Sequence, residues 1–262
     1  MNYKQKYQNQ KTILGLSTAV VILVLVMAFA FLVGPSLVSS GSPDKTPPPQ
    51  TTPTPLVGDV KFYDEHLEIA VKNALGVEGE VTNEDMQRLT VLEYDEGVIK
   101  DLEGLQYAIN LKELKIRCDL FELSPIVDLQ IEKLTLICQV SAQPLMEELA
   151  TMEYIKYLDL TDCGISIIGF LEELPVLETL ILDKNRVSDL QYVYAMKKLK
   201  TLSIKENNLK EVNELYNNTS IEYLYLDNNK IDKDSLELVV NSMLQLRECT
   251  WEGNPVEEDS EE

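Results

Sequence analysis

A repeat of 22 residues is the feature that most constrains how this chain can fold. Three consecutive copies begin at Ile155, Leu177 and Leu199, and a fourth opens at Ile221. In the first three copies, apolar residues occupy positions 1, 4, 6, 11, 14 and 17. Self-similarity at such a period predicts a solenoid, because one unit cannot bury its apolar edge and stacked units share a continuous core.

The pattern within each unit predicts one short strand and a return segment. Positions 4 and 6 alternate as the inward residues of a strand do, and positions 11, 14 and 17 have near-helical spacing. Asparagine at position 9 is expected to bond the backbone where the strand turns. The fold class is therefore α/β, a curved solenoid of about eight leucine-rich repeats over residues 89–256, with an irregular stretch at 117–154. The strands are expected near Leu92, Leu114, Leu134, Leu158, Leu180, Leu202, Leu224 and Cys249.

Both ends of the solenoid are expected to be covered. Residues 58–88 predict a helical cap, with Asp64 as an N-cap, Gly76 as a stop signal and a capping box that begins at Thr82. At the far end, Trp251 takes a strand position and Asn254 precedes Pro255 in the last turn. The acidic segment 257–262 is expected to be a disordered tail.

Residues 13–33 predict a membrane-spanning helix. They contain no charged side chain and are long enough to cross about 30 Å of hydrocarbon. Lys4, Lys6 and Lys11 in segment 1–12 place the N-terminus in the cytoplasm by the positive-inside rule. A signal peptide cleaved before Gly41 is the alternative, and it would give a secreted protein.

Residues 34–57 predict a spacer. They hold seven of the 11 prolines together with many serines and threonines, a composition that cannot form a core and favours extended polyproline II. The spacer would carry the repeat domain away from the membrane.

Composition and charge exclude several functional classes. The formal net charge is −21, and all but one of the acidic residues lie after residue 57, so nucleic acid is not an expected partner. His66 is the single histidine and no C-x-x-C pair occurs, which removes the usual metal and triad templates. We therefore expect no enzyme activity, cofactor or metal.

The repeats behind a helical cap resemble internalin-type bacterial surface proteins. The run from Asp101 to Leu111, DLEGLQYAINL, carries this resemblance together with the 22-residue period. The resemblance covers roughly residues 58–256. It implies a right-handed solenoid, display at a bacterial surface and protein binding on the concave sheet. The chain departs from the pattern in its degenerate repeats at 117–154.

The concave face is the expected binding site, because outward strand positions of such repeats face solvent. Tyrosines there can bury a large ring and keep a hydroxyl for hydrogen bonding, and two isoleucines stand where water is expected. The predicted ligand-binding residues are Arg117, Ile137, Tyr157, Asp159, Ile181, Asp183, Lys205, Tyr223, Tyr225 and Asp227.

The cysteines leave two interpretations open. Cys118 and Cys138 hold the same offset from their strands, so a disulfide between neighbouring strands is geometrically conceivable. Free buried thiols are the other interpretation, with Cys163 replacing the asparagine at position 9.

These observations favour a single-pass membrane protein that binds a protein ligand or an envelope component through its extracytoplasmic repeat domain. A membrane scaffold or sensor that acts through residues 13–33 is the alternative.

Overall fold

The computed structural model describes residue 56, residues 58–216 and residues 218–255. The predicted segments 1–12, 13–33 and 257–262 lie outside the described residues, as do 34–55 and 57 of the linker. No helix within the described ranges is long and apolar enough to cross a bilayer.

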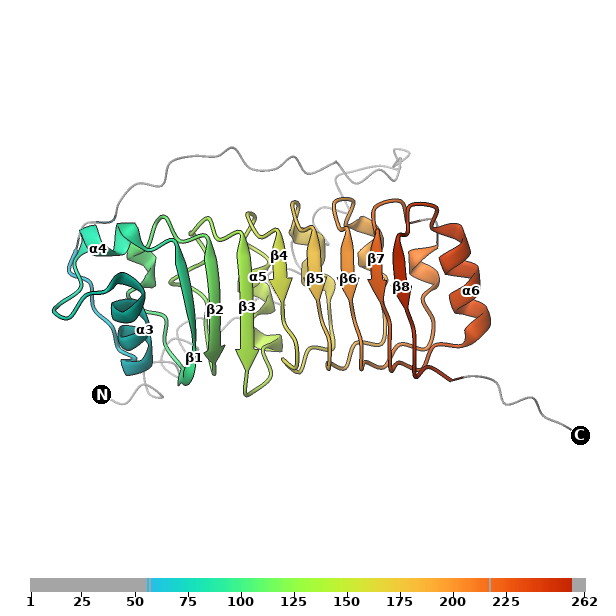
Figure 1. Ribbon diagram of the computed structural model, residues 1–262, viewed down its shortest axis with the longest axis horizontal. Helices are drawn as coiled ribbons and strands as arrows, with labels where there is room; N and C mark the ends of the chain where they lie inside the picture. Colours follow the sequence, from blue (N-terminus) through green and yellow to red (C-terminus); the bar gives the residue numbers. More distant parts are fainter. Residues whose placement is uncertain (1–55, 57, 217, 256–262) are drawn as a thin grey trace, which may run out of the picture. The chain divides into compact units, whose positions relative to one another are not determined.

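The described residues form one parallel sheet in which the strands follow chain order (Figure 1). The eight strands include every one predicted from the repeat, and the irregular stretch supplies β3 without breaking the order. The strands are β1 (Val91–Ile99), β2 (Glu113–Cys118), β3 (Lys133–Cys138), β4 (Tyr157–Asp159), β5 (Thr179–Ile181), β6 (Thr201–Ser203), β7 (Tyr223–Tyr225) and β8 (Glu248–Thr250).

Two helices cover the β1 end of the sheet, as the capping signals predict. Helix α3 (Glu65–Leu75) begins after Asp64, whose carboxylate accepts from the Leu67 N–H, and ends at Gly76 in the left-handed conformation. Helix α4 (Asn83–Arg88) begins with a capping box between Thr82 and Asp85. Helix α3 packs against β1, so the first leucines of the solenoid are shielded from water.

The return segments on the other side of the sheet are short helices. They are the 3₁₀ turns η1 (Leu105–Tyr107), η2 (Gln143–Leu145), η3 (Gly169–Glu173), η4 (Val193–Ala195) and η5 (Asn213–Leu215), and the α-helices α5 (Met146–Leu149) and α6 (Lys233–Ser242). Helix α6 was not predicted individually. It occupies the longest interval between strands, and Leu236 and Val239 bury its inner face.

The core is a column of leucines stacked in register. Leu134, Leu158, Leu180, Leu202 and Leu224 are paired across successive strands, and all five are fully buried. Burial of one leucine side chain contributes about 1.5–3 kcal/mol. One apolar cluster extends from the cap helices to α6, so the repeats share a single core.

The position-9 asparagines form a hydrogen-bonded ladder, as predicted. Asn207 accepts from the Val187 N–H at 2.9 Å and donates to the carbonyls of Leu182 at 2.8 Å and Lys205 at 3.0 Å. Each amide therefore joins the strand of one repeat to the turn of the preceding one. The same arrangement occurs at Asn185, Asn229 and Asn254.

In the repeat that begins at Ile155, the Cys163 thiol takes the place of the ladder amide. The Cys163 thiol donates to the Leu136 carbonyl at 3.2 Å and its Sγ lies 2.8 Å from that of Cys138. Cys118 and Cys138 are paired in register on β2 and β3. All four cysteines, Cys249 included, are free thiols, which is the second of the two interpretations that the sequence left open.

Hydrogen bonding and burial hold these thiols in the protonated form. The bond with Cys118 raises the pKa of Cys138 to about 12. The bond with Cys138, followed by burial, raises the pKa of Cys163 well above its ordinary value. These thiols are therefore structural groups rather than nucleophiles, because the thiolate is the reactive form.

We expect Asn207→Ala to lower the free energy of unfolding by about 2–4 kcal/mol, because it leaves buried backbone groups without partners. Denaturant unfolding would measure the stability of this variant and of a control, Asn208→Ala. The control removes only a bond to the exposed Lys230. Equal stability of the two variants would contradict the ladder's importance.

We also expect the protein to lose stability as pH rises above about 9. Unfolded thiols ionise near pH 8.5, whereas Cys163 keeps its proton when folded, so the unfolded state gains by releasing it. Cys163→Asn restores the ladder residue and removes this group. The variant should lose about 2 kcal/mol less than wild type between pH 8 and 10.5, as urea unfolding at each pH would measure. Identical pH slopes would show that Cys163 does not hold its proton.

Candidate functional site

The ten predicted ligand-binding residues all lie on the exposed face of the sheet. They alternate with the buried leucines, and each side chain is half-buried. The structure places Arg117 and Ile137 on β2 and β3, and the other eight on β4 to β7 or within two residues of the ends of these strands. The ten residues thus lie on one face of the sheet, and binding at these positions stays a prediction.

Tyrosines border a strip of this face. Tyr157 on β4 lies in one row with Thr179, Thr201 and Tyr223, the equivalent positions of β5, β6 and β7. Three strand spacings separate the two tyrosines, which is about 14 Å. Short side chains lie between them. We call this strip the trough because of the sizes of its side chains: the larger Tyr157, Tyr223 and Tyr225 border it, and the smaller Thr179, Ile181, Thr201 and Ser203, its floor, lie between them in register.

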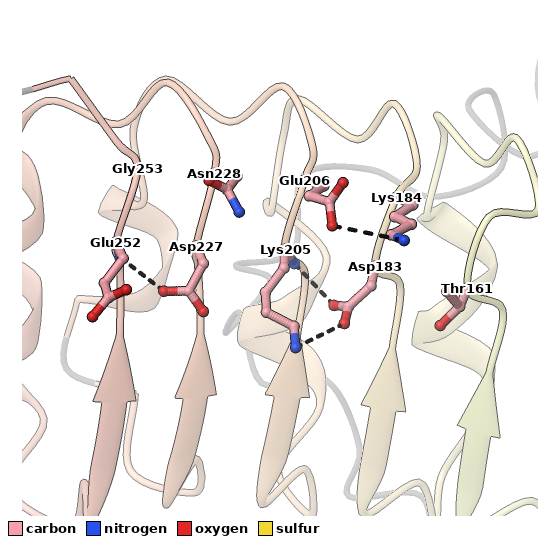
Figure 2. Close-up of a pocket in the computed structure, with 9 residues that line it drawn as sticks. All are labelled: Thr161, Asp183, Lys184, Lys205, Glu206, Asp227, Asn228, Glu252 and Gly253. Carbon is pink, nitrogen blue, oxygen red and sulfur yellow. Dashed lines mark hydrogen bonds and ion pairs between the residues drawn. The ribbon is translucent and has the colours of Figure 1, made fainter.

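A hollow of about 700 Å³ lies at the carboxyl ends of the same strands. Figure 2 shows its side chains along the turns that follow β4 to β8. We call it the rim hollow. Its lining is mostly polar and charged: Thr161, Asp183, Lys184, Lys205, Glu206, Asp227, Asn228, Glu252 and Gly253.

Asp183 and Asp227 complete backbone hydrogen bonding at the rim. Asp183 accepts from the Lys205 N–H at 2.9 Å and from the Ser203 hydroxyl at 2.6 Å, and its other oxygen lies 3.2 Å from the Lys205 ammonium. Asp227 accepts from the Glu252 N–H and the Thr250 hydroxyl in the same way. These carboxylates therefore help to hold the sheet together, a function that the sequence analysis did not foresee.

The local register explains why these carboxylates are needed. The Leu182 carbonyl accepts from Asn185 and Asn207, so the amide ladder has taken the acceptor next to the Lys205 N–H. Asp183 supplies a replacement acceptor. The same change of acceptor occurs in the last repeat. The Leu226 carbonyl accepts from Asn229 and Asn254, and the Glu252 N–H donates to Asp227 instead.

The tyrosines of the trough sit in an acidic environment. Burial raises the pKa of Tyr225, and the Glu248 carboxylate raises it further. Burial also raises the pKa of Tyr157, with Asp159 adding to the effect. Both hydroxyls thus stay neutral donors. The Lys205 ammonium lies 5.9 Å from the Tyr225 ring centre, within range of a cation–π contact.

Arg117 and Ile137 form a separate group. They are paired in register on β2 and β3, so β4 separates them from the floor of the trough. The Arg117 Nε is buried and has no hydrogen-bond partner among the described residues. The ten predicted residues therefore do not make one compact site.

Position 8 of the repeat was missed by the sequence analysis. Lys184, Glu206 and Asn228 have φ values of 57°, 55° and 55°, in the left-handed region, and their turns project into the rim hollow. The signal was the recurrence of one polar residue directly before each ladder asparagine.

Other chemistry-bearing residues do not converge on this face. His66 on α3 lies 3.2 Å from the Tyr94 hydroxyl of β1, in the cap. Within the described ranges, no group of three or more His, Cys, Asp or Glu side chains is arranged to hold a metal ion.

Comparison with known proteins agrees with this architecture. A family model described as leucine-rich repeat matches residues 175–231. No curated protein sequence matches the chain.

Several solved structures are similar to the chain. An internalin C2 from Listeria monocytogenes is 27% identical with a TM-score of 0.65, over 76% of this chain and 88% of that one. An internalin F from the same organism is 23% identical with a TM-score of 0.66, over 74% of this chain. The match spans only 58% of that internalin's length. A leucine-rich-repeat protein from Leptospira interrogans is 23% identical with a TM-score of 0.53, over 65% and 50% of the two chains.

The parallel sheet of stacked repeats agrees with these comparisons. The described part of the chain is therefore a leucine-rich-repeat solenoid that is similar in fold to the internalins.

Proposed function

We propose that this protein binds another protein through the exposed face of the sheet over β4 to β7. The observation that carries the proposal is the trough, with Tyr157 on one side and Tyr223 and Tyr225 on the other. Tyrosine contributes strongly to interfaces because its ring buries a large area and its hydroxyl still finds a partner. Such a face is suited to recognition rather than catalysis.

The rigidity of the face supports this proposal. Hydrogen bonds from neighbouring strands hold Asp183 and Asp227 in place, and the leucine column fixes the backbone beneath them. A pre-ordered surface loses less conformational entropy on binding. Binding in the trough should therefore lose little conformational entropy, which favours a higher affinity for the same contact area.

We further propose that residues 13–33 anchor the protein in a membrane and that the repeat domain lies outside the cytoplasm. The support comes from the sequence: an uncharged segment of spanning length follows Lys4, Lys6 and Lys11, and a proline-rich spacer precedes the domain. In this arrangement the trough would meet partners in the envelope or beyond it.

We expect replacement of Tyr223 and Tyr225 by alanine to weaken partner binding about tenfold or more, because each removes a hot-spot ring. Full-length protein would capture partners from envelope extract and medium, and affinity for each captured protein would be measured directly. The control is Tyr194→Ala with Tyr216→Ala, two exposed tyrosines of the return segments. If both double variants bind equally well, the trough is not the site.

We expect the protein to remain in the membrane fraction after carbonate washing, with residues 13–33 intact by mass spectrometry. Protease added to intact cells should digest the repeat domain. A mature chain that begins at Gly41 would instead show cleavage and a secreted protein, and a domain protected from protease would contradict the orientation.

A further inference from the structure

We propose that the partner presents a basic polypeptide segment, which lies in the trough and directs a lysine or arginine side chain into the rim hollow. This inference rests on the proposed function, since it assumes that the exposed sheet face binds protein. It adds the chemistry of the ligand and the place where its charge is recognised.

The distribution of charge on the sheet face supports a basic ligand. At the outward strand positions of β2 and β3, basic residues outnumber acidic ones: Lys115, Arg117 and Lys133 against Glu113. From β4 to β8 the balance reverses. The charged residues at those outward positions are Asp159, Asp183, Asp227, Glu248 and Glu252, against Lys205 alone among the described positions.

The acidic side chains at the two ends of the strands differ in how they are neutralised. Those before the strands are paired with the next repeat, for example Glu178 with Lys200 at 2.7 Å and Glu132 with Lys156 at 2.6 Å. At the rim, Glu252 has no ion pair within the described part of the chain. Glu206 has only a contact of 3.9 Å with the exposed Lys184. The rim hollow therefore has carboxylates available to a cation.

Lys205 cannot neutralise these carboxylates. Its ammonium is paired with Asp183 at 3.2 Å, and Figure 2 shows Asp227 on the other side of Lys205, with Glu252 beyond Asp227. Asp227 accepts one bond on each oxygen, which leaves lone pairs for a further donor. A lysine or arginine entering between Asp227 and Glu252 would gain charge-assisted hydrogen bonds.

The trough has room for one polypeptide segment beside this site. The backbones of β4 and β7 are about 14 Å apart, and the tyrosine rings occupy part of that span, so the strip suits an extended segment better than an α-helix, which measures about 10–12 Å across with its side chains. Tyr223 and Tyr225 lie on β7, and Asp227 follows two residues after the end of that strand. A segment with an apolar residue against these rings would therefore carry its neighbouring side chains toward the rim hollow.

Charge also argues against other occupants. A second copy docked by the same face would oppose the acidic strands β4–β8 to themselves, and like charges facing each other are unfavourable. Acidic peptides and nucleic acids would meet the same repulsion. A basic polypeptide is the occupant that the face attracts.

A random-peptide display library tests this inference when it is selected on the full-length protein in detergent or bilayer discs. We expect the selected peptides to combine lysine or arginine with aromatic or aliphatic residues. Synthetic versions should bind at least fivefold more weakly to Glu252→Lys and Glu206→Lys, and binding should weaken as salt rises. Glu172→Lys makes the same charge change on η3, and its affinity should stay within twofold of wild type.

The outcomes separate this inference from the proposed function. Peptides that need Tyr223 and Tyr225 but contain no basic residue, or that bind Glu252→Lys and Glu206→Lys as tightly as wild type, would overturn the basic-ligand inference and leave the binding face in place. If every selected peptide binds the tyrosine double variant unchanged, both proposals fail. Denaturant unfolding of each variant would exclude loss of fold as the cause.

Discussion

The amide of the position-9 asparagine is the interaction on which the rest of the structure depends. Each amide accepts from the backbone of one turn and donates to carbonyls of two strands, as Asn207 does between Val187, Leu182 and Lys205. A buried turn without these bonds would leave polar groups unpaired, at a cost of about 1–3 kcal/mol each. The amide therefore permits the chain to reverse within a dry core and fixes the distance between repeats.

The ladder also shapes the surface above it. The asparagine amides donate to the Leu182 and Leu226 carbonyls. The Lys205 and Glu252 N–H groups therefore donate to other acceptors. Asp183 and Asp227 supply them, so acidic side chains at the rim are partly a consequence of folding. Their negative charge nevertheless faces the rim hollow. One pair of residues thus stabilises the sheet and sets the electrostatic character of the face.

The elements that sequence predicts best are those encoded within one repeat or one helix end. The leucine column, the ladder asparagines and the caps at Asp64 and Thr82 follow from local spacing and were found correctly. The bonds of Asp183 and Asp227 join residues 20–25 positions apart, and their need arises only when the register is known. Helix α6 and the position-8 turns were likewise missed, because a longer interval or a polar residue does not specify a conformation.

The fold itself does not explain the tyrosines of the trough. Leu158 and Leu224 supply the buried contacts of β4 and β7, and short residues such as Thr179 and Thr201 suffice at the equivalent outward positions of β5 and β6. Tyr157 and Tyr223 therefore place large rings where the solenoid requires none. Folding accounts for Asp183 and Asp227, but it gives no reason for aromatic side chains on both sides of a floor of small ones. Recognition of a partner, as proposed for this face, would supply that reason, and the tyrosines therefore carry more weight than the charges in the proposal.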